Sequence, residues 1–392
     1  MSQLSNSYFS ADSDPRSVYV HIPFCRHRCG YCNFALVAGR DHLIEPFLDA
    51  LESEIRLACD QFSTTDRSIE IDTLFFGGGT PSHLSPQQLE RLGELVFSRF
   101  HLGEDAEVSA ECNPSDISIQ MLDSLREIGV NRISLGVQSF NADKLKVLQR
   151  DHDATVAKAA FEMAMERIGN VSMDLIFATP NETQEAWQQD LQTALELQPS
   201  HLSTYELTWE KGTTFWNRKS KGELDGSSED LRVQMYQAAI ERCGSAGLKQ
   251  YEVSSFAVEG KRCQHNLQYW LCNPWFAFGP GAAEFTHGSR KTNHRSPTTW
   301  MKRIQAGESP VGEKEELSAR DRAIERLIFG LRMVDGIEVA AFESAVGQTL
   351  EDLTGGTIES LIQRGLAEKT ETHVRLTESG RMLADTVSVE LL

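Results

Sequence analysis

The chain has 392 residues, of which 40% are hydrophobic, and it carries a formal net charge of −19. This length suffices for two or three domains with a large buried core, and the acidic balance disfavours attraction to nucleic acid or to an anionic membrane. No apolar run approaches the roughly 18 residues that a transmembrane segment needs. Residues 1–16 are polar and lack the apolar region of a signal peptide, so we expect a disordered N-terminus on a cytoplasmic protein.

Strand-like and helix-like patterns alternate between residues 17 and 250. Apolar runs rich in β-branched residues predict six strands, at SVYVHI, IDTLFF, EVSAE, RISLGV, VSMDLIF and HLSTYELT. Segments with helical periodicity lie between them, at residues 43–58, 86–100, 117–128, 154–168 and 182–197. Such alternation gives parallel strands joined by crossover helices, which predicts an α/β fold with a partial (β/α)6 barrel over residues 17–284. A doubly wound open sheet is the alternative.

Chemically active side chains follow successive predicted strands. Three cysteines follow the first strand, the turn GGGTPS (77–82) follows the second, and Glu111, Gln138 and Asp174 belong to later strands. Because the sites of β/α barrels form at the carboxyl ends of the strands, we expect these residues at one mouth of the barrel. Backbone N–H groups of the glycine turn could approach a carboxylate or amino-acid group of a ligand. A tight turn in which Pro81 opens the next helix would also explain the run of glycines.

Cys25, Cys29 and Cys32 have the spacing C-x3-C-x2-C. Eight cysteines are too sparse for a disulfide scaffold in a chain of this length. A zinc site completed by His21 or His27 is one interpretation. A 4Fe–4S cluster is another, because three thiolates would leave one of its four irons open to a small molecule.

The cysteine spacing after a first barrel strand, with an aromatic residue before the third cysteine, resembles the radical S-adenosylmethionine (SAM) superfamily. GGGTP resembles the methionine-binding turn of that superfamily. YVHIPFC, GGGTPS, LGVQSFN, MDLIFATP and HNLQYW narrow the resemblance, from about residue 17 to the C-terminus, to the oxygen-independent coproporphyrinogen III oxidase group and its HemW-type branch of heme chaperones. The resemblance implies a 4Fe–4S cluster on Cys25, Cys29 and Cys32, with SAM on the open iron.

The resemblance also assigns residues to SAM. These are Tyr19, Tyr31, Gly78, Gly79, Thr80 and Glu111, while Gln138, Arg150 and Asp174 match residues that hold a second SAM in the oxidase. As ordinary strand-end carboxylates, Glu111 and Asp174 would instead pair with Arg132 or Arg150.

Two features separate the chaperone branch from the oxidase. The oxidase carries a fourth cysteine two residues after the third, where this chain has Phe34, and it has a longer region before the cysteines. The motif H-N-x-x-Y-W marks the chaperone branch, where it is implicated in heme binding, and here it supplies His265, Asn266, Tyr269 and Trp270. The imidazole could ligate heme iron and the aromatic rings could cover a porphyrin, whereas a packed core histidine is the alternative.

Two further features surround this motif. Cys263 and Cys272 flank it, so a thiol ligand or a covalent heme link is an option. The chain also departs from the family pattern, because Ala283 and Glu284 stand where family members usually have His-Ser.

The region after residue 284 has a different pattern. Residues 285–317 are polar and basic, which indicates a connecting segment with one short helix. Residues 318–392 resemble a winged-helix-like domain, and members of the family end in the same kind of domain. Eight Lys and Arg against thirteen Asp and Glu leave this domain a net charge of −5, so we expect no binding to nucleic acid.

The resemblance implies a heme chaperone that binds heme and transfers it to an acceptor protein, with the cluster and SAM supporting or gating the transfer. One alternative is oxidation of coproporphyrinogen III by a 5′-deoxyadenosyl radical, which we do not expect without the fourth cysteine. Another is a radical reaction on an unrelated small substrate. Cleavage of SAM is compatible with all three, and the sequence does not identify the acceptor.

Overall fold

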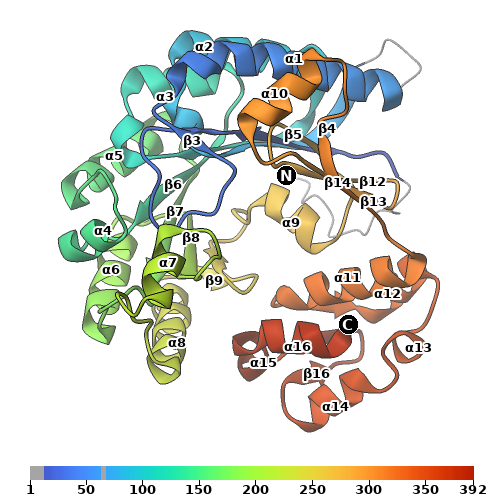
Figure 1. The fold of residues 1–392 in the computed structure, drawn as a ribbon. Helices are drawn as coiled ribbons and strands as arrows, with labels where there is room; N and C mark the ends of the chain where they lie inside the picture. Colours follow the sequence, from blue (N-terminus) through green and yellow to red (C-terminus); the bar gives the residue numbers. More distant parts are fainter. Residues whose placement is uncertain (1–12, 63–67) are drawn as a thin grey trace.

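The computed structural model describes residues 13–62 and 68–392. Residues 1–12, most of the N-terminal segment expected to be disordered, lie outside the described residues. The described chain forms an α/β core and a smaller C-terminal domain, with helix α9 (Gln264–Trp270) between them (Figure 1). None of the helices in this part of the chain has the length and apolar character that crossing a bilayer requires.

A nine-stranded sheet forms the core, in the order β11-β1-β4-β5-β6-β7-β8-β10-β9. Its parallel strands in chain order are β1 (Ser17–Ile22), β4 (Ile69–Gly78), β5 (Phe100–Cys112), β6 (Arg132–Gln138), β7 (Val171–Phe177) and β8 (His201–Glu206). The edges are extended by β11 (Phe276–Phe278), parallel to β1, and by antiparallel β10 (Ser255–Ala257) and β9 (Lys249–Gln250). Because the strand order does not reverse from β1 to β8, the partial barrel is confirmed and the doubly wound sheet is not.

Helices cover the outer face of this sheet as an arc (Figure 1). They are α1 (Ile44–Phe62), α2 (Pro86–Phe97), α3 (Ile119–Glu127), α5 (Ala154–Arg167), α6 (Gln184–Glu196) and α8 (Glu229–Ser245). The first five overlap the helical ranges predicted from periodicity. Their starts follow local sequence signals; for example, Ser85 and Gln88 form a capping box around Pro86 at the start of α2. The apolar faces of strands and helices merge into one cluster that includes Val18, Leu74 and Leu202.

Residues 285–317, expected as a connecting segment with one short helix, contain more structure than the pattern indicated. Helix α10 (Pro297–Gln305) packs its buried Trp300 into the barrel core. β12 (Ala283–Thr286), β13 (Ser289–Asn293) and β14 (Val311–Glu316) form a separate antiparallel sheet. β14 is exposed along most of its length, so it lacks the apolar alternation that reveals a strand.

The C-terminal domain has a hydrophobic cluster of its own. Its long helix α11 (Ala319–Arg332) contacts α9, and Met333 packs against Leu267 and Leu271. The other helices are α12 (Val339–Val346), α13 (Leu350–Thr354), α14 (Thr357–Gln363), α15 (Glu378–Met382) and α16 (Ala384–Leu391). The strands β15 (Ile337–Glu338), β17 (His373–Leu376) and β16 (Ala367–Lys369) form the small sheet of a winged-helix-like arrangement.

Candidate functional site

The three motif cysteines lie on one loop beyond β1. The loop begins at the short strand β2 (Phe24–Cys25) and returns along β3 (Val37–Ala38), which pairs with it in parallel. Cys25 is buried and Cys29 and Cys32 are half-buried. The Cys25 thiol lies 3.1 Å from the Thr80 hydroxyl, and burial raises its pKa to about 12. The loop therefore brings the thiols next to the glycine turn, although no three His, Cys, Asp or Glu side chains of the described chain converge on a single metal-ion position.

The glycine turn packs tightly against the cysteine strand. The Gly78 N–H donates to Glu111 Oε2 at 2.8 Å, and the Gly79 N–H donates to Ile22 O at 2.8 Å. A Cβ on Gly79 would lie 2.7 Å from Phe24 O, and Gly78 has a φ of +108°. The glycines are thus required by close backbone approach. In this structure these two N–H groups have acceptors in the protein, and a contact between the turn and a ligand stays a prediction.

A small polar cavity, which we call the inner cavity, lies inside the barrel, between the barrel strands and α9. Its volume is about 160 Å³. It brings together three residues expected at SAM and three expected at heme. These six are Tyr19, Glu111, Asp174, His265, Asn266 and Tyr269, and the remaining lining comes from strand residues such as Ser134, Ser203 and Tyr205.

Among the described residues neither carboxyl group of the inner cavity forms an ion pair with an arginine, although Arg132 lines the same cavity and its charge acts on Asp174. Glu111 accepts from the Gly78 N–H, and burial raises its pKa to about 7. Asp174 accepts from the Ser134 hydroxyl at 2.9 Å, and burial raises its pKa as well. Arg150 donates instead to Gly136 O at 3.0 Å. The inner cavity therefore holds acids that burial pushes toward the neutral form.

Arg150 and Gln138 both face the cysteine-loop side of the barrel. The guanidinium of Arg150 lies 3.6 Å from the Cys29 sulfur. Gln138 ends β6 with a φ of 66°, which is rare for a residue with a side chain. Its Oε1 atom is buried, and within the described chain it has no hydrogen-bond partner. A strained residue with an orphaned acceptor indicates that a ligand belongs here. Tyr31 packs edge-on against Phe215, with ring centroids 6.1 Å apart.

His265 is a packed core residue in this structure. It is fully buried, its Nδ1 lies 2.9 Å from the Thr73 hydroxyl, and its Nε2 lies 2.8 Å from the Tyr269 hydroxyl. Burial and the charge of Arg132 lower its pKa to about 3. Both ring nitrogens are engaged, so neither is available to heme iron without rearrangement. Trp270 lies outside the cavity wall, where the Arg332 guanidinium sits 5.4 Å from its ring centroid.

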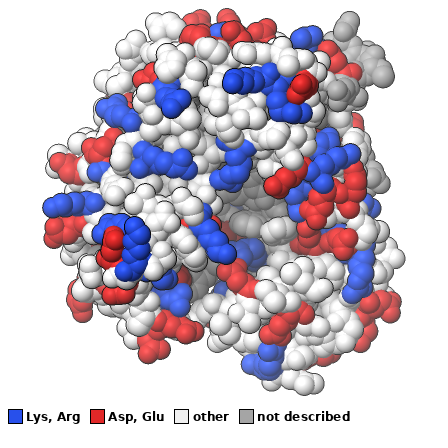
Figure 2. Space-filling model, in the orientation of Figure 1, with Lys and Arg blue, Asp and Glu red and all other residues white. Residues whose placement is uncertain are grey.

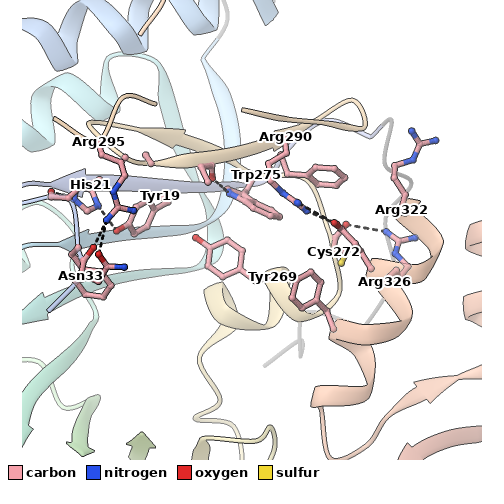
Figure 3. Close-up of a pocket in the computed structure, with 18 of the residues that line it drawn as sticks. Tyr19, His21, Asn33, Tyr269, Cys272, Trp275, Arg290, Arg295, Arg322 and Arg326 are labelled. Atoms are coloured by element: carbon pink, nitrogen blue, oxygen red, sulfur yellow. Dashed lines mark hydrogen bonds and ion pairs between the residues drawn. The ribbon is translucent and has the colours of Figure 1, made fainter. Parts of the chain in front are cut away.

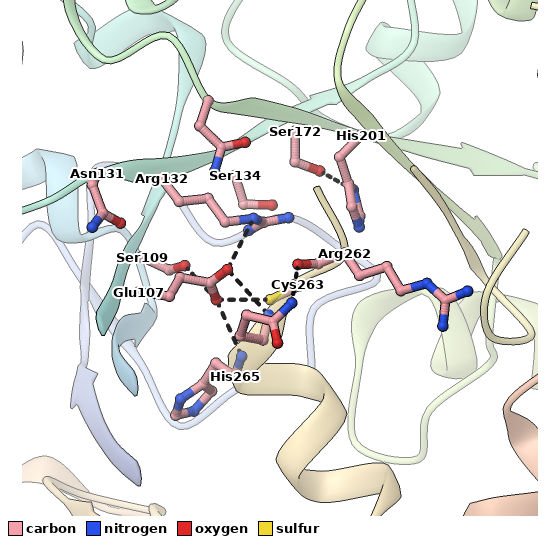
Figure 4. Close-up of polar contacts among 12 residues, drawn as sticks. Glu107, Ser109, Asn131, Arg132, Ser134, Ser172, His201, Arg262, Cys263 and His265 are labelled. Atoms are coloured by element: carbon pink, nitrogen blue, oxygen red, sulfur yellow. Dashed lines mark hydrogen bonds and ion pairs between the residues drawn. The ribbon is translucent and has the colours of Figure 1, made fainter. Parts of the chain in front are cut away.

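Glu107 anchors the start of α9, a role that sequence reasoning missed (Figure 4). Its carboxylate accepts from the N–H groups of Gln264 and His265, each at 3.1 Å, and from the Cys263 thiol at 3.5 Å. A carboxylate at a helix N-terminus satisfies free N–H groups and matches the helix dipole. Cys263 is therefore held in the core and does not reach a cavity. The only signal in the sequence was an acidic residue four positions before Glu111 on the same strand.

A larger cavity lies between the barrel and the C-terminal domain, and we call it the interdomain pocket (Figure 3). Its volume is about 620 Å³, and the molecule is visibly hollowed between the two domains (Figure 2). Several positions that the sequence had singled out line it. They include Phe34, where the oxidase has its fourth cysteine, together with Cys272, Ala283, Tyr19 and Tyr269.

The far wall of the pocket comes from α11, and the sequence analysis singled out none of its lining residues. Ala319, Arg322, Arg326 and Phe329 face the pocket from that helix. Their spacing of three to four residues was present in the sequence as one helix face. The spacing alone does not say which surface that face meets.

Comparisons with known proteins agree with this architecture. The model of the radical SAM superfamily matches residues 19–194, and that of the HemN C-terminal domain matches residues 317–383. The chain is 34% identical to the heme chaperone HemW of Bacillus subtilis over 95% of this chain and 98% of that protein. It is 31% identical to the heme chaperone HemW of Escherichia coli over 95% and 97% of the two chains. The solved structure of coproporphyrinogen III oxidase (HemN) from Escherichia coli, described as a radical SAM enzyme, aligns with a TM-score of 0.84 at 23% identity, covering 98% and 91%.

The fold and the cysteine loop thus define a radical SAM protein. At these identities over nearly the whole length, the chain belongs to the HemW family of that superfamily.

Membership of the superfamily implies a 4Fe–4S cluster and SAM, and the residues present fit both. Cys25, Cys29 and Cys32 would hold the cluster, with the Arg150 cation beside Cys29 to offset the thiolate charge. The orphaned Gln138 Oε1 supplies a buried acceptor on the same side. A bound cluster would supply one-electron chemistry to a SAM molecule on its open iron. The protein's own contribution is to position the thiols and to bury the adjoining carboxyl groups.

Proposed function

We propose that this chain is a heme chaperone that binds heme and passes it to an acceptor protein. The observation that carries the proposal is similarity at over 30% identity to proteins named as heme chaperones across nearly the full length of both chains. Phe34 supports it, because this position, where the oxidase has its fourth cysteine, offers an apolar ring to the interdomain pocket. The chain works in the cytoplasm, and its acceptor is a protein of unassigned identity.

The assignment of residues to SAM belongs to this proposal. Tyr19, Thr80 and Glu111 lie beside the cysteine loop or line the inner cavity, as SAM contacts require. Tyr31 and the two glycines would shape that side of the site. A second SAM would use Gln138, Arg150 and Asp174.

The second candidate function is oxidation of coproporphyrinogen III. The observation in its favour is the structural similarity to the oxidase over 98% of this chain. At 23% identity that similarity concerns the fold. The missing fourth cysteine argues against the activity.

The test is to reconstitute the cluster anaerobically and divide one sample between two assays. We expect hemin titration to give a saturable Soret band, and transfer of that heme to an apo-hemoprotein. We expect no protoporphyrinogen IX from coproporphyrinogen III with SAM and a reductant. Robust turnover, or no saturable heme binding by the reconstituted protein, would refute the chaperone proposal.

A further inference from the structure

The two cavities differ in volume, so they can hold ligands of different size. The inner cavity, about 160 Å³, contains His265 and Asn266. The interdomain pocket, about 620 Å³, lies within the range of sites that enclose drug-sized ligands. A tetrapyrrole is a flat macrocycle of that larger class, so only the interdomain pocket accommodates one without opening the barrel.

The charge of the interdomain pocket is opposite to that of the whole protein. Among the residues that the structure describes, four arginines line it against one glutamate, Glu325, in a chain whose net charge is −19. The arginines are Arg290, Arg295, Arg322 and Arg326. Figure 3 shows Arg290, Arg322 and Arg326 gathered at the α11 end of the pocket and Arg295 at the opposite end. Such a cluster selects a ligand that carries carboxylates along one edge.

Arg322 brings positive charge to the pocket wall. Its guanidinium donates to Leu317 O at 3.1 Å, which is a neutral carbonyl group. Arg326 donates to Cys272 O at 3.3 Å, and Arg290 donates to Glu325, whose carboxylate offsets its charge. The guanidinium group of an arginine can donate two parallel hydrogen bonds to the two oxygens of one carboxylate.

The remaining lining of the pocket is aromatic. Tyr269 and Trp275 pack edge to face with ring centroids 4.8 Å apart, and Phe34 is 56% exposed on the facing loop. Phe329 of α11 lies on the same side as the arginines. Flat apolar walls with cations at one end match a macrocycle that has two acidic side chains on one edge.

We propose that the interdomain pocket is the heme-binding site of this protein, with the propionate edge at the α11 end of the pocket, where Arg322 holds a propionate. The inference rests on the proposed function and adds the site to it. The ring lies between the barrel loop that carries Phe34 and the α9–α11 wall, in contact with Tyr269 and Trp275. His265 acts on this site through Tyr269, because its hydrogen bond holds the Tyr269 hydroxyl at the pocket wall.

The experiment compares two charge reversals on one helix by hemin titration of the full-length protein. Arg322→Glu places a carboxylate in the pocket, and we expect the Kd for hemin to rise about tenfold or more. Arg320→Glu is the matched control, since Arg320 lies on the same helix but does not line the pocket, and its Kd should stay within about threefold of the unchanged protein. Circular dichroism confirms that both variants fold. Equal Kd values for the two variants would overturn the inference.

A second arm tests the carboxylates of the ligand. Heme dimethyl ester lacks both charges, so we expect it to bind the unchanged protein about tenfold or more weakly than hemin, and Arg322→Glu to weaken it little further. Undiminished binding of the ester would overturn the role of the arginines.

A third arm separates this site from ligation by His265. His265→Gln keeps groups that can hydrogen-bond Thr73 and Tyr269, and we expect hemin affinity within about threefold of the unchanged protein. Loss of binding in His265→Gln with full binding in Arg322→Glu would move heme to the inner cavity. Failure of the unchanged protein to bind hemin at all would instead refute the proposed function.

Discussion

The inner cavity and the interdomain pocket differ in size, charge and origin. The inner cavity is small, is lined by carboxyl, hydroxyl, imidazole and guanidinium groups, and comes mainly from barrel-strand residues. The interdomain pocket is about four times larger, is lined by aromatic rings and arginines, and comes from segments far apart in the chain. The difference shows how one chain forms two distinct cavities: a small polar one inside the barrel, and a large one at the domain interface that we propose for heme.

The two cavities share a wall. Tyr19 and Tyr269 line both of them. Tyr19 hydrogen-bonds His21 at 3.0 Å, and Tyr269 hydrogen-bonds His265 at 2.8 Å. These two phenols are therefore the direct structural link between the SAM side and the proposed heme site.

The largest expected effect is loss of the iron–sulfur cluster with heme binding retained. Cys29→Ala should abolish the broad visible absorption of a reconstituted 4Fe–4S centre, because each thiolate holds one iron. The same variant should bind hemin with a Kd within about threefold of the unchanged protein, since Cys29 does not line the interdomain pocket. Cys59→Ala, in helix α1, is the control and should keep its iron. Full iron content in Cys29→Ala would contradict the assignment of the motif, and loss of hemin binding would contradict the separation.

The next effect concerns the shared wall. Glu107→Ala removes the acceptor of two buried N–H groups at the start of α9, and each unpaired buried group costs about 1–3 kcal/mol. We therefore expect faster amide hydrogen exchange at residues 264–268 and a lower melting temperature. Glu104→Ala, an exposed position on the same strand, should change neither. Unaltered exchange in Glu107→Ala would show that α9 is held by its apolar contacts alone.

A third prediction concerns the support beneath the interdomain pocket. Glu54 is buried on α1 and accepts from the Gly279 N–H at 2.8 Å and the Asn293 side chain at 2.6 Å. Burial raises its pKa from 4.5 to about 7, so the unfolded chain ionises first as pH rises. Between those values the folded state holds the extra proton, and the contribution of Glu54 to stability falls with rising pH, by about 3 kcal/mol at most.

The measurement is the free energy of unfolding at pH 5 and pH 7.5. Glu54→Gln cannot ionise, so its stability should fall less between these two pH values than that of the unchanged protein. Glu52→Gln, exposed on the same helix, is the matched control. A pH dependence in Glu54→Gln as steep as in the unchanged protein would assign the effect to other groups.

The smallest expected effect is confined to the interdomain pocket. Ala283→His restores the residue that family members usually have at a position that lines this pocket. An imidazole is a ligand for heme iron, so we expect a shifted Soret maximum with a hemin Kd changed by less than about threefold. The control is Ala345→His, because Ala345 is exposed and also lines the pocket, so this variant tests whether any histidine on the lining shifts the Soret maximum. Phe285 is buried and is therefore not a suitable control position. An unchanged spectrum in Ala283→His would place the iron away from β12.

The sequence by itself determined the barrel and the cysteine loop, because their signals are local. Alternating apolar strands and amphipathic helices specify six strands, β1 and β4 to β8, and the helices α1, α2, α3, α5 and α6 through short-range periodicity, and C-x3-C-x2-C lies within one loop. The order of the strands then brings Glu111 and Asp174 together in the inner cavity.

Only the tertiary structure decided the state of the candidate ligands and the existence of the larger pocket. In the sequence the H-N-x-x-Y-W motif favoured His265 as a heme ligand over a core residue, whereas in this structure His265 is buried and has two hydrogen-bond partners. Arg322 and Arg326 lie one helical turn apart on α11, but their role depends on which surface meets Tyr269 and Phe34. That packing joins residues separated by almost 300 positions, and no local pattern encodes a contact between apolar and charged faces so far apart in the chain.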